Sequence, residues 1–249
     1  MIVSAARRAA DLLAIVLVLL LMWEGLHVVV GETALPGPVP TLSYLARLVT
    51  TARFADNAAA TATAFAFALM LAYGIGLAIG VWMGAHRLSG AVGEPILVAL
   101  YSLPKITLYP VVLLIFGLGI SGKTAFGALH GILPVALLTM AAIRNISPVY
   151  LKTAQSMRLS SWQTVMMVLF PATLPEVVSG LRIGLTVTLL GVLLAEMFAS
   201  KQGLGFLIMN AMSLLQTEEM IAVAVLLFAF AALTNALLLW IEHRLHRRV

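Results

Sequence analysis

The sequence contains no cysteine and little charge. Of its 249 residues only 10% are Asp, Glu, Lys or Arg, whereas about a quarter of a soluble domain is charged. Without cysteine no disulfide can form, and the sequence does not indicate whether the protein is in an oxidising or a reducing compartment. Of the whole chain, 62% is apolar, and the mean hydropathy is +1.07. This is the composition of an integral membrane protein.

Motifs for catalysis are also missing. The chain has no Gly-x-x-x-x-Gly-Lys-Ser/Thr phosphate loop, so it cannot by itself be an ATPase. It has no His-Glu-x-x-His, and no Ser/His/Asp set stands out. We therefore expect a chain that is not an enzyme and binds no cofactor of its own.

Carboxylates are absent from the middle of the apolar stretches. Asp occurs only at Asp11 and Asp56, and the glutamates of the spans, Glu24, Glu94, Glu176 and Glu196, lie toward their ends. A proton-coupled carrier is expected to have a carboxylate near the bilayer centre. The chain also lacks the internal repeat of many secondary transporters. Both absences weigh against a secondary transporter, which stays an alternative class together with a membrane scaffold.

Six stretches reach the roughly 20 apolar residues that a membrane-crossing helix needs. They lie at about 11–30, 60–84, 93–118, 123–143, 174–198 and 219–241. The first follows Arg7 and Arg8, as in a signal peptide, but it is long for one and no small-x-small site follows, so we expect it to be retained. The sequence predicts an all-α membrane protein with one domain over residues 1–249.

The distribution of basic residues predicts the orientation. Six spans place both termini on one side, and that side holds nine Lys and Arg against four on the other. Because basic loops of membrane proteins stay inside, both termini are expected in the cytoplasm of a cell (inner) membrane. Basic residues on the cytoplasmic side account for the net charge of +5, so this charge does not indicate that the chain binds nucleic acid. In the first outer segment, 31–59, the prolines from Pro36 to Pro40 suggest a linker, and Leu42, Leu45 and Val49 suggest a short amphipathic helix.

Glycines and a lysine mark two spans. Gly76, Gly80 and Gly84 recur every four residues, a spacing that lets helix backbones approach closely in lipid; chance in an Ala/Gly-rich chain is the alternative. The third span is broken by Pro104 and Pro110. Lys105 lies between them, and a cation at membrane depth should face a cavity or a partner, unless it snorkels to the interface.

Two further charges lie within one span. Arg182 and Glu196 fall on a similar helix face about 20 Å apart, too far to pair with each other. We expect each to bind a different neighbouring helix.

The loop 144–173 predicts two short helices outside the membrane. Ser147-Pro148 is a physically sound helix start, and Tyr150, Ala154 and Met157 form one apolar face. A second start follows at Ser160-Ser161, and that helix is expected to end at Pro171. The loop either rests on anionic lipid or docks a soluble partner.

The run LKTAQSMRLSSWQTVMMVLFPATLPEVVSGLRIG resembles the cytoplasmic loop of binding-protein-dependent ABC importer permeases. Lys152-Thr153-Ala154 takes the place of the family's Glu-Ala-Ala, Arg158 that of its Gly, and Pro171 follows at the expected distance. Segments marking the nitrate/taurine/alkanesulfonate branch occur in order: Leu35-Pro36-Gly37-Pro38, Ser102-Leu103-Pro104-Lys105, Phe116-Gly117-Leu118-Gly119, Ala195-Glu196-Met197 and Gly203-Leu204-Gly205.

The resemblance implies a type I ABC importer permease. Its implied partners are two copies of an ABC ATPase that use ATP and Mg, a second permease copy in a homodimer, and an extracytoplasmic solute-binding protein. The implied solute is a small anion such as a sulfonate, taurine or nitrate, and a pyrimidine vitamin precursor or aromatic acid is the alternative.

The resemblance also implies site residues. Those of the ATPase-coupling loop are Tyr150, Leu151, Lys152, Ala154, Gln155, Met157, Arg158 and Leu159. The candidates for the translocation path are Tyr101, Lys105, Arg182 and Glu196.

Overall fold

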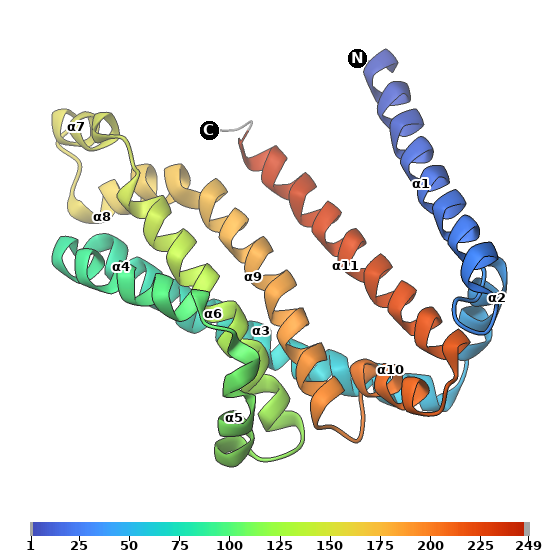
Figure 1. Ribbon diagram of the computed structural model, residues 1–249. Helices are drawn as coiled ribbons and strands as arrows, with labels where there is room; N and C mark the ends of the chain where they lie inside the picture. Colours follow the sequence, from blue (N-terminus) through green and yellow to red (C-terminus); the bar gives the residue numbers. More distant parts are fainter. Residues whose placement is uncertain (1, 247–249) are drawn as a thin grey trace.

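The computed structural model describes residues 2–246, and this part of the chain is helical, without a strand (Figure 1). Its elements are α1 (Ile2–Val30), α2 (Pro38–Leu48), α3 (Ala52–Ala85), α4 (Arg87–Ser102), η1 (Lys105–Leu108), α5 (Tyr109–Phe116), α6 (Ile120–Arg144), α7 (Pro148–Ser156), α8 (Ser161–Thr164), η2 (Val165–Leu169), α9 (Phe170–Phe198), α10 (Leu204–Ser213) and α11 (Thr217–His246). Among the described residues, five helices and one bent pair are long and apolar enough to cross a membrane, in agreement with six predicted spans.

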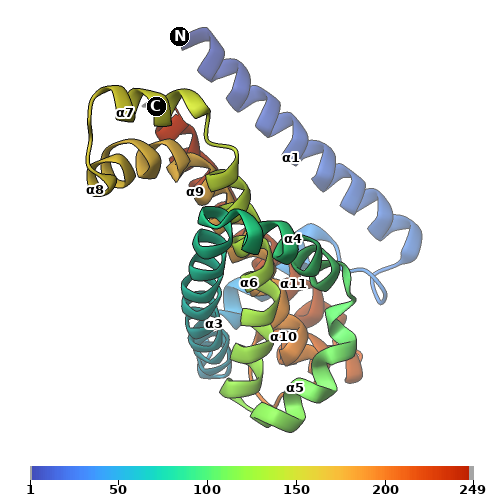
Figure 2. The ribbon, with the colours of Figure 1, turned by 90° about the vertical axis from the view of Figure 1, so that its left-hand side faces the viewer.

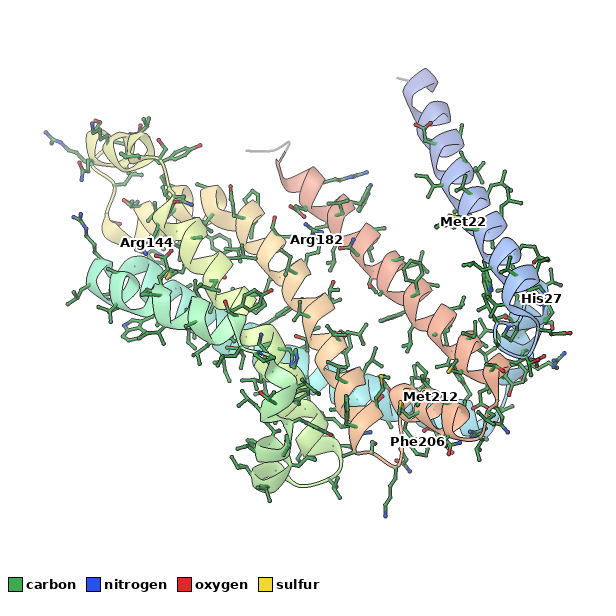
Figure 3. The ribbon with its side chains drawn as sticks, in the orientation of Figure 1. Met22, His27, Arg144, Arg182, Phe206 and Met212 are labelled. Carbon is green, nitrogen blue, oxygen red and sulfur yellow. The ribbon has the colours of Figure 1, made fainter. Side chains whose placement is uncertain are left out.

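The protomer is built around α6, which packs against α3 and α9 (Figure 2). In the most apolar stretch of α6, 67% of the residues are buried inside the protomer, whereas in residues 13–30 of α1 none are. α1 is joined to the rest near the end that leads into α2, where Trp23 Nε1 donates to Pro36 O and the ring of His27 bonds Leu35 O (Figure 3). A membrane helix without protein neighbours must be covered by lipid or by another chain.

Three glycines allow α3 and α6 to approach each other. A Cβ added at Gly76, Gly80 or Gly84 would lie 2.8, 2.6 or 2.8 Å from the Cβ of Val135, Thr139 or Ile143, respectively. Both rows advance by four residues, so the glycines of α3 face one ridge of α6 along its C-terminal half. The spacing that the sequence shows therefore lies at a helix contact.

The third span is bent rather than straight. α4 and the η1–α5 segment meet at 87°, and the break falls at Leu103-Pro104, where the proline ring cannot donate a backbone hydrogen bond. Pro110 does not break the helix as predicted, because it lies in the first turn of α5, where no donor is needed. Pro95 lies within α4, which begins at Arg87 instead of residue 93.

Residues 31–59, which connect the first two spans, are more helical than predicted. α2 starts within the proline run at Pro38, and Thr51 caps α3 at Ala52, eight residues before the predicted start of the second span. The covered face of α2 carries Thr41 and Leu48, whereas Leu42 and Val49 are exposed. Leu48 packs on α10 and α11, so tertiary contact rather than apolar periodicity sets the orientation of α2.

The helix that starts at Ser161 does not end at Pro171. Residues 162–198 form one helical span, and its turn at η2 is a π-helix in which Phe170 N–H bonds Val165 O, five residues back. The wider turn accommodates Pro171, which lacks a donor and lies just beyond it. Pro175 lies further along, inside α9.

The first turns of α1 and the last turns of α11 lie at the same end of the molecule as α7 (Figures 1 and 2). α5 and α10 lie at the opposite end. The protruding pair of short helices therefore shares a side with both ends of the described chain.

Candidate functional site

Residues 147–169, which we call the α7–α8 hairpin, form a structured protrusion. Ser147 caps α7 by accepting from Val149 N–H, and Ser160 and Gln163 bond each other's backbone N–H at the start of α8. This reciprocal pair is a capping box. Both helix starts predicted from the serines are thus present.

Arg158 makes the turn between the two helices in a left-handed conformation, with φ of 53°. Leu159 N–H bonds Ala154 O at 3.1 Å and Arg158 N–H bonds Gln155 O at 2.9 Å, which closes the end of α7. A side chain costs roughly 1 kcal/mol in this conformation, which glycine adopts freely. The residue at the family's Gly position therefore keeps the backbone shape that a glycine would provide.

The exposed surface of the hairpin is partly apolar. Its large exposed apolar side chains are Val149 (66%), Tyr150 (42%), Met157 (65%) and Trp162 (69%) and, in η2, Val165 (42%), Met166 (44%) and Met167 (67%). Lys152, Gln155 and Arg158 surround them and are exposed, Leu159 is half-buried, and the side chain of Leu151 lies outside the described residues. Ala154 is 2% exposed, so the expectation that it belongs to an outward contact face is wrong: it is packed inside the hairpin.

Two cavities flank the junction between the hairpin and the bundle. One of about 640 Å³ lies between the end of α6, the start of α7 and α9, and is bordered by Tyr150 and Glu176. The other, of about 370 Å³, is apolar and lies beneath η2 between α3 and α6. The hairpin is therefore well ordered within itself but not tightly packed against the bundle.

The bend between α4 and η1 places polar groups on the protomer surface. Lys105 Nζ donates to Tyr101 O at 2.9 Å and lies 4.6 Å from the centre of the Tyr101 ring. Tyr101 and Ser102 are exposed and Lys105 is half-buried. Ile106, the next residue, packs on the core formed by Tyr109, Phe126 and Ala195, which fixes η1 against α6 and α9.

Glu196 is the centre of a buried polar cluster at the C-terminal end of α9. Its carboxylate accepts from Lys123 Nζ at 3.2 Å, from Thr61 Oγ1 at 2.8 and 3.0 Å, and from Gly205 N–H at 3.0 Å. Side-chain exposure is 4% for Lys123 and 0% for Glu196. Lys123 also donates to Gln202 O, so the cluster holds the 199–205 connection onto α3 and α6.

Gly203 completes this cluster with a φ of 123°, and a Cβ there would overlap the Glu196 carboxylate. Its N–H donates to Asn57 Oδ1 at 2.7 Å, and Leu204 N–H donates to Thr61 Oγ1 at 2.8 Å. Sequence reasoning missed Asn57, Thr61 and Lys123. The available signal was a lysine at the first residue of a predicted span, 123–143, where its charge needs a partner.

Arg182 binds a different helix, as expected. Its Nε donates to Glu242 at 2.9 Å and its Nη1 to Asn235 Oδ1 at 3.1 Å, and Ser179 also donates to Glu242 (Figure 3). The four path candidates thus separate into two groups. Tyr101 and Lys105 lie at an accessible bend, whereas Arg182 and Glu196 are used in contacts between helices.

Curated relatives of the chain are membrane permease proteins. It is 31% identical to the taurine transport system permease protein of Escherichia coli (strain K12) over 58% of this chain and 52% of that protein. It is 27% identical to a putative aliphatic sulfonates transport permease protein of Bacillus subtilis (strain 168) over 92% and 83%, and 23% identical to a nitrate import permease protein of Synechococcus elongatus over 78% and 73%. The chain thus spans about half the length of the first of these relatives and most of the other two.

Solved structures share the fold. The MetNI methionine ABC transporter in inward-facing conformations superimposes with a TM-score of 0.64 at 20% identity, over 74% of this chain and 92% of that one. An amino acid ABC transporter superimposes with a TM-score of 0.61 at 16% identity, over 83% and 97%. The fold is therefore that of type I ABC importer permeases. Residues 72–249, which include the bend, the α7–α8 hairpin and Glu196, match the family described as "Binding-protein-dependent transport system inner membrane component", and the chain belongs to that family.

Proposed function

We propose that the chain is the membrane-spanning subunit of an ATP-driven importer and that the α7–α8 hairpin is its contact with a separate ATPase. The observation that carries this proposal is a protruding hairpin, capped at both helices, with exposed Met157 and Trp162. Capping at both helices fixes its shape, and apolar side chains displayed on a rigid protrusion favour a protein partner. In this arrangement both termini and the hairpin are cytoplasmic.

The connection from the hairpin to the outer loop supports a lever mechanism. Residues 162–198 form one helical span of 37 residues, about 55 Å at 1.5 Å per residue. A displacement of the hairpin is transmitted along α9 to Glu196, which holds residues 199–205. The cavities beside α7 and η2 leave room for that displacement.

The complete importer is proposed to contain two copies of this chain, two ATPase subunits that use ATP and Mg, and an extracytoplasmic solute-binding protein. The solute is proposed to be a small anion, such as a sulfonate, taurine or nitrate. The names of the curated relatives support this class. The exposed apolar helices, above all α1, fit burial against a second copy and lipid.

The hairpin contact is tested by Met157→Glu. The side chain is 65% exposed, so the substitution leaves the packing of the protomer unchanged while placing a charge in the proposed contact. We expect normal abundance in the membrane, loss of ATPase co-purification and loss of solute uptake. Arg244→Gln is the control, because Arg244 lies over the Trp240 ring near the end of α11, away from the hairpin, and both readouts should persist. If Met157→Glu retains the ATPase and uptake, the hairpin is a segment that rests on lipid.

A further inference from the structure

Lys105 differs in its electrostatic environment from three other cations of the membrane helices. Lys123 pairs with Glu196 at 3.2 Å, Arg182 pairs with Glu242 at 2.9 Å, and Arg144 pairs with Glu94. Lys105 forms no ion pair within residues 2–246. A cation at membrane depth is costly, so it is retained where water or a transient anion compensates it.

Lys105 lies at mid-depth in the bundle. The next residue, Ile106, packs on the core that contains Phe126, whose ring centre lies 4.5 Å from that of His130. His130 is ten residues into α6, a helix of 25 residues, and is therefore near its middle. The bend at Leu103-Pro104 brings η1 to this level, and its neighbours Tyr101 and Ser102 are exposed on the protomer surface.

The side chain of Lys105 does not extend toward the membrane surface. A snorkelling lysine extends its stem so that the ammonium meets the headgroups. Here Nζ folds back to the carbonyl of Tyr101, four residues earlier, and lies over the Tyr101 ring. The ammonium has three N–H donors and this carbonyl uses one. The charge is thus held in place at the bend with donor capacity left over.

We propose that Lys105 gives the solute path a positive potential at mid-depth and provides the counter-charge for a small anionic solute. The inference rests on the proposed function, since it places the path of the importer along this bend. In a complex with two copies of the chain, the two lysines contribute to the same path. The cation–π contact with the Tyr101 ring and the hydrogen bond to Tyr101 O position the ammonium, and its remaining N–H donors bind the anion.

The absence of native cysteine allows a direct measurement of the potential. Ser102→Cys introduces one thiol beside Lys105, in the complete complex in lipid nanodiscs, where both membrane faces meet water. Its rate of reaction is measured with two methanethiosulfonate reagents, the anionic 2-sulfonatoethyl and the cationic 2-trimethylammonioethyl compound. Each rate is divided by the rate of the same reagent with 2-mercaptoethanol, which removes intrinsic reactivity.

A unit charge about 6 Å away in a water-like dielectric changes each rate about threefold and the ratio of the two rates about tenfold. We expect the normalised ratio at Ser102→Cys to favour the anionic reagent by about that factor. Lys105→Gln should abolish the preference, and Lys105→Arg should keep it because the charge remains. Lys201→Gln, which removes an exposed lysine of the outer loop, should leave it unchanged.

Two results would overturn the inference: a ratio near one with Lys105 intact, or a preference that survives Lys105→Gln. In either case Lys105 serves only to cap the end of α4. The first measurement needs no change at Lys105, so it decides the matter even if Lys105→Gln fails to assemble. Neither rate depends on the hairpin contact, so failure of the Met157→Glu test and failure of this one are distinguishable.

Discussion

Removing Lys123 should destabilise the protein more than removing both charges of its buried pair. In Lys123→Met the carboxylate of Glu196 keeps its bonds from Thr61 and Gly205 but loses its only cation within 4 Å among the described residues. The side chain of Glu196 is fully buried, so water cannot replace the lysine. The remaining charge is then uncompensated in a medium of low dielectric.

The expected cost is about 3–5 kcal/mol, the range for breaking a buried ion pair by removing one partner. For a chain of this size that corresponds to a fall of roughly 10 °C in the midpoint of thermal unfolding. Glu196→Gln in the same background removes the uncompensated charge, and its amide oxygen can still accept from Thr61 and Gly205. The double variant should therefore recover most of the loss.

The assay is the apparent melting temperature of the purified complex, followed by fluorescence-detected size exclusion after heating. Single and double variants form a mutant cycle with the parent protein, so the coupling between the two residues is measured directly. The expected order of stability is parent, then double variant, then Lys123→Met. A Lys123→Met protein as stable as its parent would refute the reasoning, because it would mean that Glu196 carries no buried charge.

Three further outcomes follow from the structure. Gly80→Val should lower stability by about 1–3 kcal/mol by overpacking, since a Cβ there already lies 2.6 Å from Thr139 Cβ, whereas Gly25→Ala, with open space around it, should have no such effect in the same melting assay. Arg158→Gly should be tolerated or raise the melting temperature slightly, since glycine relieves about 1 kcal/mol at a φ of 53°; a marked loss would show that the Arg158 side chain is needed for the turn. A single Cys in place of Ser43, which is exposed on α2, should react in intact cells with a thiol reagent that does not cross the inner membrane. Thr41 is fully buried and therefore unsuitable for this test. If Ser43→Cys does not react, the proposed orientation is reversed.

Local signals in the sequence predicted the local structure well. The apolar stretches gave the six spans, because a helix in lipid must satisfy its own backbone hydrogen bonds. Ser147 and Ser160 gave the two helix starts of the hairpin, since their side chains satisfy N–H groups a few residues away. Where the prediction failed, a distant contact overrode the local pattern. The buried face of α2 is set by α10 and α11, and the π-turn at η2 lets the helix pass Pro171.

The candidate site was predictable only in part, for the same reason. Lys123 and Glu196 are 73 residues apart, and Thr61 is 135 residues from Glu196, so no spacing in one sequence indicates that they meet. Ala154 was assigned to an outward face from its periodicity with Tyr150 and Met157, but periodicity cannot tell which side of a short helix faces its own hairpin. Lys105 could be recognised from the sequence as a candidate site residue, because a cation between two prolines is unusual at membrane depth. Recognising it does not require knowing which residues surround it in space.

The position of Glu196 links the two ends of the proposed mechanism. α9 begins at the hairpin and ends at the connection that Glu196 holds by Gly205 N–H and, through Lys123, by Gln202 O. Between these ends, Gly184 and Gly191 lie close to Val135 and His130 of α6, so α9 can slide or tilt only as far as that contact allows. The Tyr109 hydroxyl donates to Ala195 O at 2.7 Å, which ties the segment carrying Lys105 to the same turn of α9. A displacement of the hairpin therefore reaches the outer connection and the bend together, because both are fixed to the last turns of one helix.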